Sequence, residues 1–251
     1  MRAQHFLILA AAALVALACS SAHEGLRVAG DDELIVPKSL AVSALEGGNG
    51  VLELFALTLR SGPSSTEAYA ALRNTGDAPA CGAAVSLELF DKAEQSVAAG
   101  ISALYSKHLY RLTDGSGSIV ACVAPAEVAM GAVTDLPAEL VIESLGTVVY
   151  RCPYFALDVE PVDGLAISEV KSVAAGVGTA YTGTLHNGLE VTVTNPSVAV
   201  FPVNGVGRPL GVATGRGTVE IPPGGSWAFE TNSVEAKGSD YVAYPAGSLV
   251  K

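Results

Sequence analysis

The clearest strand signal in this chain is Val85 to Asp91, which reads Val-Ser-Leu-Glu-Leu-Phe-Asp. Its apolar residues stand at every second position, which is the spacing of a β-strand that buries one face. Similar short stretches, separated by turn-forming Gly, Pro, Asn and Asp, occupy residues 51–59, 65–73, 119–123 and 147–154. This pattern predicts an all-β protein.

Helical signals are weak in the same region. The sequence Leu136-Pro137-Ala138-Glu139-Leu140 is typical of a helix start, so a helical turn is expected over residues 137–145. A second helical turn is expected over residues 127–133. Asp91, which ends its predicted strand, is expected to accept hydrogen bonds from the backbone of the following turn.

The second part of the chain repeats the first. The block Leu72-Arg73-Asn74 returns as Leu185-His186-Asn187, and Leu87–Asp91 returns at nearly the same offset as Val198–Pro202. A third block, Val123–Met130, returns as Ile221–Phe229. The near-constant offset of the first two blocks predicts a duplicated domain, with one copy over residues 51–160 and the other over 161–251. A period this long excludes a solenoid, and the first copy carries an insertion over about residues 102–118.

The repeated blocks resemble the FxLYD-type domain, a small immunoglobulin-like β-sandwich of bacterial envelope and secreted proteins. Leu87–Asp91 matches the naming motif, with Leu for its Phe and Phe for its Tyr. In the second copy Pro202 stands where the motif has Asp, and in the first copy Ala126 stands where glycine is typical of the turn. The resemblance implies two tandem immunoglobulin-like β-sandwich domains, and a fold of this kind does not by itself imply an activity.

Residues 1–18 are expected to be an export signal. Arg2 precedes a continuous apolar run from Phe6 to Leu17, which is too short to span a bilayer comfortably. The sequence Ala16-Leu17-Ala18-Cys19 resembles the lipobox of bacterial lipoproteins, with Ala16 where Leu is usual. The resemblance implies cleavage before Cys19, acylation of Cys19 and, from the serines that follow, sorting to the outer membrane. An ordinary secretory signal and a retained anchor are the alternatives.

Residues 19–50 are expected to form a tether between the acylated cysteine and the folded body, with one short strand over Leu34–Val36. Three cysteines remain beyond the tether, namely Cys81, Cys122 and Cys152. Because export permits disulfides, three pairings are possible. Cys81 and Cys122 each lie beside a core strand of the repeat, so we favour a bond between them and expect Cys152 to be a buried thiol.

Composition excludes several classes of function. The chain has 25 acidic and 14 basic residues, a net charge of −11 that becomes −12 when Arg2 leaves with the signal peptide. This charge disfavours nucleic acid as a partner, and the 50% apolar content is too high for a disordered chain. The sequence has no nucleotide-binding glycine loop, no metal-ligand spacing of Cys and His, and no Gly-x-Ser-x-Gly. We therefore expect no nucleotide, no metal, no cofactor and no enzymatic activity.

Candidate binding residues lie in the insertion and in one late strand. Tyr105, His108 and Tyr110 fall within the insertion, and long loops on a sandwich often carry binding sites. The period-two spacing of His108 and Tyr110 fits an extended hairpin equally well. Trp227 alternates with Phe229, so both rings are expected on one side, either in the core or as a platform for a sugar or a partner.

The sequence thus favours a membrane-anchored protein of the bacterial cell envelope. Its expected role is that of a non-catalytic binding, adhesive or assembly module for another envelope protein or a polysaccharide. Two alternatives stay open. One is a secreted hydrolase whose site is assembled from distant residues, for instance His108, Asp114 and a serine. The other is a purely structural spacer.

Overall fold

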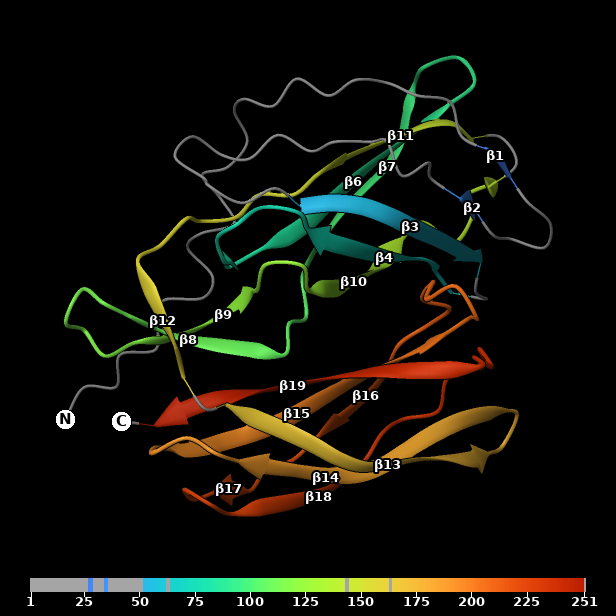
Figure 1. The fold of residues 1–251 in the computed structure, drawn as a ribbon. Coiled ribbons are helices and arrows are strands. Elements are labelled where there is room, and N and C mark those ends of the chain that lie inside the picture. Colours follow the sequence, from blue (N-terminus) through green and yellow to red (C-terminus); the bar gives the residue numbers. More distant parts are fainter. Residues whose placement is uncertain are drawn as a thin grey trace, which may run out of the picture.

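The computed structural model describes residues 27–28, 34–35, 52–61, 64–142, 145–162 and 164–250. The expected signal peptide, Cys19 and most of the tether lie outside these residues. Over the described residues the chain is all-β, built from antiparallel sheets with no α-helix (Figure 1). It therefore contains, in this part of the chain, no helix that could cross a membrane. The expected strand over 34–36 is present as β2 (Leu34–Ile35), which pairs with β1 (Arg27–Val28).

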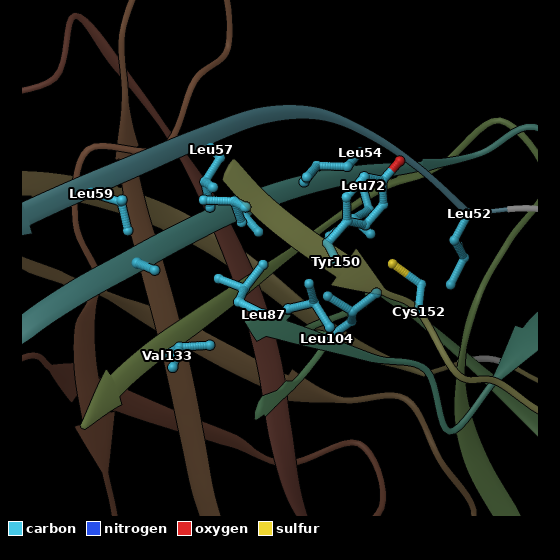
Figure 2. Packing of buried hydrophobic residues seen from close by; sticks show 14 of the residues in the cluster. Leu52, Leu54, Leu57, Leu59, Leu72, Leu87, Leu104, Val133, Tyr150 and Cys152 are labelled. Carbon is cyan, nitrogen blue, oxygen red and sulfur yellow. The ribbon is translucent and has the colours of Figure 1, made fainter. Parts of the chain in front are cut away.

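The first half is a sandwich of two sheets around one apolar core. One sheet has the order β10-β4-β3 and the other β11-β6-β7. Figure 2 shows how Leu57 and Leu72 from the first sheet meet Leu87 and Tyr150 from the second. The strands are β3 (Leu52–Ser61), β4 (Thr66–Asn74), β6 (Ala84–Asp91), β7 (Ser96–Ala103), β10 (Val128–Leu136) and β11 (Leu145–Arg151).

The predicted alternation of buried and exposed residues over Val85–Asp91 is confirmed in β6. Val85, Leu87 and Leu89 are fully buried, whereas the residues between them are partly exposed. In the second half, Val198 and Val200 are buried in the core of that half, and Ala199 and Phe201 on the other face of β15 are buried as well. Both strands therefore present an apolar face to a core, as period-two spacing predicts, and β15 buries its second face in addition.

The second half has the same strand order. One sheet runs β13-β14-β18, and in the other β15 pairs with β16, β17 and β19. Its own core includes Tyr181, Leu185, Val200 and Phe229. The strands are β13 (Leu165–Ala175), β14 (Gly178–Asn187), β15 (Thr192–Val203), β16 (Ala213–Arg216), β17 (Glu220–Ile221), β18 (Ser226–Glu230) and β19 (Asp240–Val250).

A further sheet has the order β12-β8-β9-β5, and its strands β8 and β12 belong to the first half alone. The insertion forms its central hairpin, so the extended-hairpin interpretation of His108 and Tyr110 describes the structure. The strands are β5 (Ala80–Cys81), β8 (His108–Leu112), β9 (Ile119–Val123) and β12 (Val159–Val162). β12 crosses the expected domain boundary at residue 160 and pairs with β8, so we count it with the first half.

Strand pairing relates the two halves by one offset. Leu52 is opposite Asn74 as Leu165 is opposite Asn187, and Leu87 is opposite Gly100 as Val200 is opposite Ala213. The offset in residue number is the same for all four equivalent positions. After the insertion the pair Ala80–Val123 corresponds to Val193–Ile221. Ala80 and Val193 are separated by the same offset as before. The offset between Val123 and Ile221 is smaller, because the inserted hairpin adds residues to the first half before Val123.

This offset corrects one sequence alignment. The Oδ1 of Asp91 accepts hydrogen bonds from the N–H groups two and four residues later, and the Oδ1 of Asn204 does the same. Asn204, rather than Pro202, therefore takes the place of Asp91. The expected side-chain role of Asp91 is confirmed, and the second half keeps it with an amide in place of the carboxylate.

A second alignment was wrong by one residue. Met130 is opposite Ala71 in β4, and Ala228 is opposite Thr184 in β14, so Met130 corresponds to Ala228 and not to Phe229. A one-residue shift moves a strand side chain to the opposite face of its sheet. Met130 and Phe229 accordingly lie in different apolar clusters.

The helical turn expected over residues 127–133 was also wrong. Those residues lie almost entirely in β10, which pairs with β4 from Val128 to Val133. Backbone pairing with a neighbouring strand outweighs the weak local helical preference. The segment after β10 begins with a turn in which the N–H of Leu140 donates to the carbonyl of Pro137 (3.2 Å).

The turn at Ala126 has the same conformation as its counterpart in the second half, where glycine occupies the equivalent position. Its φ is +64°, close to the +72° of Gly224 at the corresponding position. In both turns the residue after it donates its N–H to a carbonyl three residues earlier. A proline precedes each of them, as in a type II turn. The first half therefore holds an alanine in a left-handed conformation that favours glycine.

Candidate functional site: the inserted hairpin

The base of the inserted hairpin is closed by a disulfide between Cys81 and Cys122, the pair that the sequence favoured. The two cysteines are directly opposite each other on β5 and β9, and Thr194 opposite Glu220 is the counterpart pair in the second half. Cys152 is buried in the core of the first half (Figure 2). The disulfide thus lies where the inserted hairpin meets a strand pair that both halves share, and only the first half has it, since Thr194 and Glu220 occupy the two positions in the second half.

Glu127 and Ser106 hold the start of the hairpin. The carboxylate of Glu127 accepts hydrogen bonds from the backbone N–H groups of Ala124 (2.7 Å) and Lys107 (2.9 Å). The Ser106 hydroxyl lies 3.1 Å from Oε2 of Glu127 and donates to the carbonyl of Cys122 at 2.6 Å. The path of the chain into β8 is therefore fixed by these polar contacts, of which the bond from Ser106 to Cys122 is buried and the bond from Lys107 to Glu127 is exposed.

The two faces of the hairpin have different surroundings. Leu109 and Ile119 face the second half and pack against its core. Tyr110 and Val120 lie on the other face and pack around the disulfide. Burial raises the pKa of the Tyr110 phenol above its usual range, and the negative charge of Glu127 adds to the effect. Tyr110 is thus a largely buried residue beside the disulfide.

Tyr105 reaches the second half of the chain. Its ring centroid lies 5.5 Å from that of Phe201 and 6.3 Å from that of Tyr244. The Nζ of Lys107 lies 5.8 Å from the centroid of the Tyr244 ring, within the range of a cation–π contact. Tyr105, proposed from sequence as a contact for an external partner, contacts another part of the same chain.

The residues named for a hydrolase do not come together. His108 is exposed at the start of β8, and Asp114 lies beyond the other end of that strand, where its Oδ1 accepts the N–H of Ser116. The length of β8 alone separates them by about 13 Å. A different imidazole–hydroxyl pair exists, since Nδ1 of His186 lies 3.1 Å from Oγ of Ser226. That pair is exposed, and no carboxylate of the described residues is hydrogen-bonded to this imidazole.

Trp227 and Phe229 face the same side of β18, as expected from their alternation. Their ring centroids are 6.0 Å apart. Phe229 is buried in the core of the second half, and Trp227 packs against that core while partly exposed. The indole therefore serves packing within its own half.

Other kinds of site find no support in the described part of the chain. It contains no group of three or more His, Cys, Asp or Glu side chains that could hold a metal ion. An open depression lies at the β13–β14 turn, lined by small residues, Val177, Glu235 and Lys237. Val177 is 92% exposed there, and Val206, in the turn after β15, is 76% exposed. Each valine stands between two glycines.

No known family model and no curated protein matches this chain. The resemblances to the FxLYD-type domain and to the lipobox therefore remain predictions from the sequence. Sequence reasoning also missed Phe201 and Tyr244, the partners of Tyr105. The signal that could have found them is the difference between the two halves. Once the strand register is known, Phe201 and Tyr244 stand where the first half has the charged residues Glu88 and Arg151.

Proposed function

We propose that this chain is an exported lipoprotein of the cell envelope that acts as a non-catalytic binding or assembly module. The observation that carries the proposal is the Cys81–Cys122 disulfide at the base of the inserted hairpin. Disulfides persist in oxidising compartments outside the cytosol, which agrees with the export signal expected over residues 1–18. Acylation of Cys19 would then hold the body at a bacterial membrane, with the outer membrane favoured.

Anchoring through lipid suits the charge of the protein. Two or three acyl chains bind a bilayer stably, whereas a single chain is marginal. The chain expected from Cys19 onward, tether included, has a net charge of −12, so anionic headgroups repel it. The tether of residues 19–50 would keep the folded body clear of the surface and present it to partners.

The end of the second half is the surface that best supports a binding role. The exposed valines Val177 and Val206 lie in turns at the same end of this sandwich. Residues 234–236 pack against both Gly178, which follows Val177, and Gly211, which follows the turn of Val206. Apolar side chains this exposed at neighbouring turns favour contact with another envelope protein. A polysaccharide remains the second kind of partner proposed.

The anchor is tested by expressing the full chain with its own signal in a bacterial host. Mass spectrometry of the membrane fraction should find an acylated Cys19 at the N-terminus, and Cys19→Ala should leave the membrane fraction. A peptide starting at an unmodified Ser20, or an intact segment 1–18, would overturn the lipoprotein assignment.

The binding role is tested separately, by chemical cross-linking in those cells. Val177→Asp with Val206→Asp should lose the cross-linked species seen with the unaltered chain, while Val219→Asp, at another exposed valine, should keep it. An unchanged cross-linking pattern in the double variant contradicts the assignment of this surface.

A further inference from the structure

We propose that the inserted hairpin is an intramolecular clamp, which holds the second half in one orientation so that both halves move as one body. We use "the clamp" for residues 105–119. The inference concerns the conformation of the chain and stands apart from the proposed anchoring and partners. Three observations support it: the apolar layer between the halves, the hydrogen bonds and ion pair that cross this layer, and the contacts that the clamp makes with the second half.

The two halves meet through a buried apolar layer. The first half contributes the outer face of its β10-β4-β3 sheet, and the second half contributes the outer face of β15 and β19, which lie beneath it in Figure 1. The fully covered side chains are Ala56, Tyr69, Ala71, Met130, Ala199, Phe201, Val203 and Tyr244. An interface of this apolar kind restrains the relative motion that is otherwise the default between neighbouring domains.

Four of the equivalent positions on the faces that do not meet are polar or small. In the second half, Thr182 corresponds to Tyr69, and Ala228 corresponds to Met130. In the first half, Glu88 corresponds to Phe201, and Arg151 corresponds to Tyr244. At these four positions the large apolar residue stands only in the half whose face is covered by the other half. The contact joins two different faces of similar sandwiches. If both faces were apolar in both halves, the same contact could form again between one chain and the next.

Directional contacts fix the orientation at three separate places. The hydroxyl of Tyr244 donates to the carbonyl of Val128 at 2.9 Å. The hydroxyl of Thr58 donates to the carbonyl of Pro209 at 2.7 Å, and Arg60 pairs with Glu235 at 3.0 Å. A sliding or rotating second half would break all three, and the two carbonyl acceptors would lose their donors.

The clamp adds contacts that have no counterpart in the second half. Tyr105 packs on Phe201 and Tyr244, and Leu109 and Ile119 pack against the core of the second half. At its base, the clamp is joined to the first half by the disulfide and by Glu127. On the other side, β13 begins three residues after β12 ends, so the connection between the halves is short as well.

Differential scanning calorimetry of the purified full chain tests the proposal. A single transition is expected, with a ratio of calorimetric to van't Hoff enthalpy of about 1 because both halves unfold together. The variant Tyr105→Ala with Leu109→Ser should split it into two transitions and raise the ratio to about 2. Val120→Ser, on the opposite face of the same hairpin, should keep one transition.

Hydrogen exchange of the unaltered chain gives a second measurement, which does not depend on a variant that folds. Amides of β4 and β14 should share one opening rate under mild denaturant, since they belong to one cooperative unit. Opening rates that differ tenfold or more between the halves, or a single transition retained by the clamp variant, would overturn the proposal.

Discussion

Asn74 and Asn187 occupy the same hydrogen-bonding position in the two halves. Each is fully buried, and each Nδ2 donates to two backbone carbonyls at 2.8–2.9 Å. Each Oδ1 accepts the N–H of the residue two positions later. The amide therefore ties the end of β4 to β9 in the first half and the end of β14 to β17 in the second.

Replacing the buried asparagine by alanine should strongly lower the free energy of unfolding. Asn187→Ala leaves the carbonyls of Val191 and Ile221 without their donor, and we expect a loss of about 3 kcal/mol in the free energy of unfolding. Urea denaturation measures it. Asn204→Ala is the control, because that side chain serves a more exposed turn and should cost about 1 kcal/mol. Equal losses for both variants would contradict the assignment.

The left-handed alanine offers a stabilising change. Ala126→Gly should raise the free energy of unfolding by about 1 kcal/mol, since glycine adopts a positive φ without a penalty from Cβ. The matched change Gly224→Ala should lower it by a similar amount. Thermal denaturation of both variants checks the sign, and a destabilised Ala126→Gly would show that Ala126 does not adopt this conformation in solution.

The disulfide should contribute strongly to stability. It joins residues 41 apart in sequence, and closing a loop of this length is expected to stabilise the fold by about 4 kcal/mol. The measurement is guanidinium denaturation of the chain with Cys81→Ala and Cys122→Ala. Cys152→Ala is a control for removing a buried sulfur without removing a crosslink. A midpoint unchanged by the double variant would exclude a crosslink between these residues.

Alkaline pH should weaken the contact between the halves. Burial raises the pKa of Tyr244, with a further contribution from the charge of Glu127. Burial and the hydrogen bond to Glu67 likewise raise the pKa of Tyr69. A tyrosine with a raised folded-state pKa contributes fully below the unfolded value of about 10, and its contribution falls as the pH rises above it.

We therefore expect each of these tyrosines to reduce stability by about 1.4 kcal/mol per pH unit above pH 10. Urea denaturation between pH 9 and about pH 11.5 measures the slope. Tyr244→Phe should reduce this slope, at the expense of about 1 kcal/mol at neutral pH from the lost bond to Val128. An identical slope in Tyr244→Phe would mean that this phenol is not buried between the halves.

Much of the fold could be predicted because its signals are local. The alternation in Val85–Asp91 and the asparagine-containing turn after Leu72 depend on neighbouring residues, and both are present as expected. The candidate site was less accessible to sequence reasoning. The insertion was located from the sequence. Tyr105 was expected to contact an external partner, whereas it packs on Phe201 and Tyr244, which are distant in the same chain, and contacts of that range leave no local pattern.

Strand periodicity and turn residues act over a few positions, so the amino-acid sequence alone predicts an all-β chain whose second part repeats the first. The register that relates the copies is visible only in the strand pairing of the folded chain, since the similar residues around Phe90 and Phe201 suggested an offset slightly too short. Tertiary structure also decided which face of each sheet is covered. Met130 and Ala228 occupy equivalent backbone positions, and only the second half resting on the first makes one of them a buried residue.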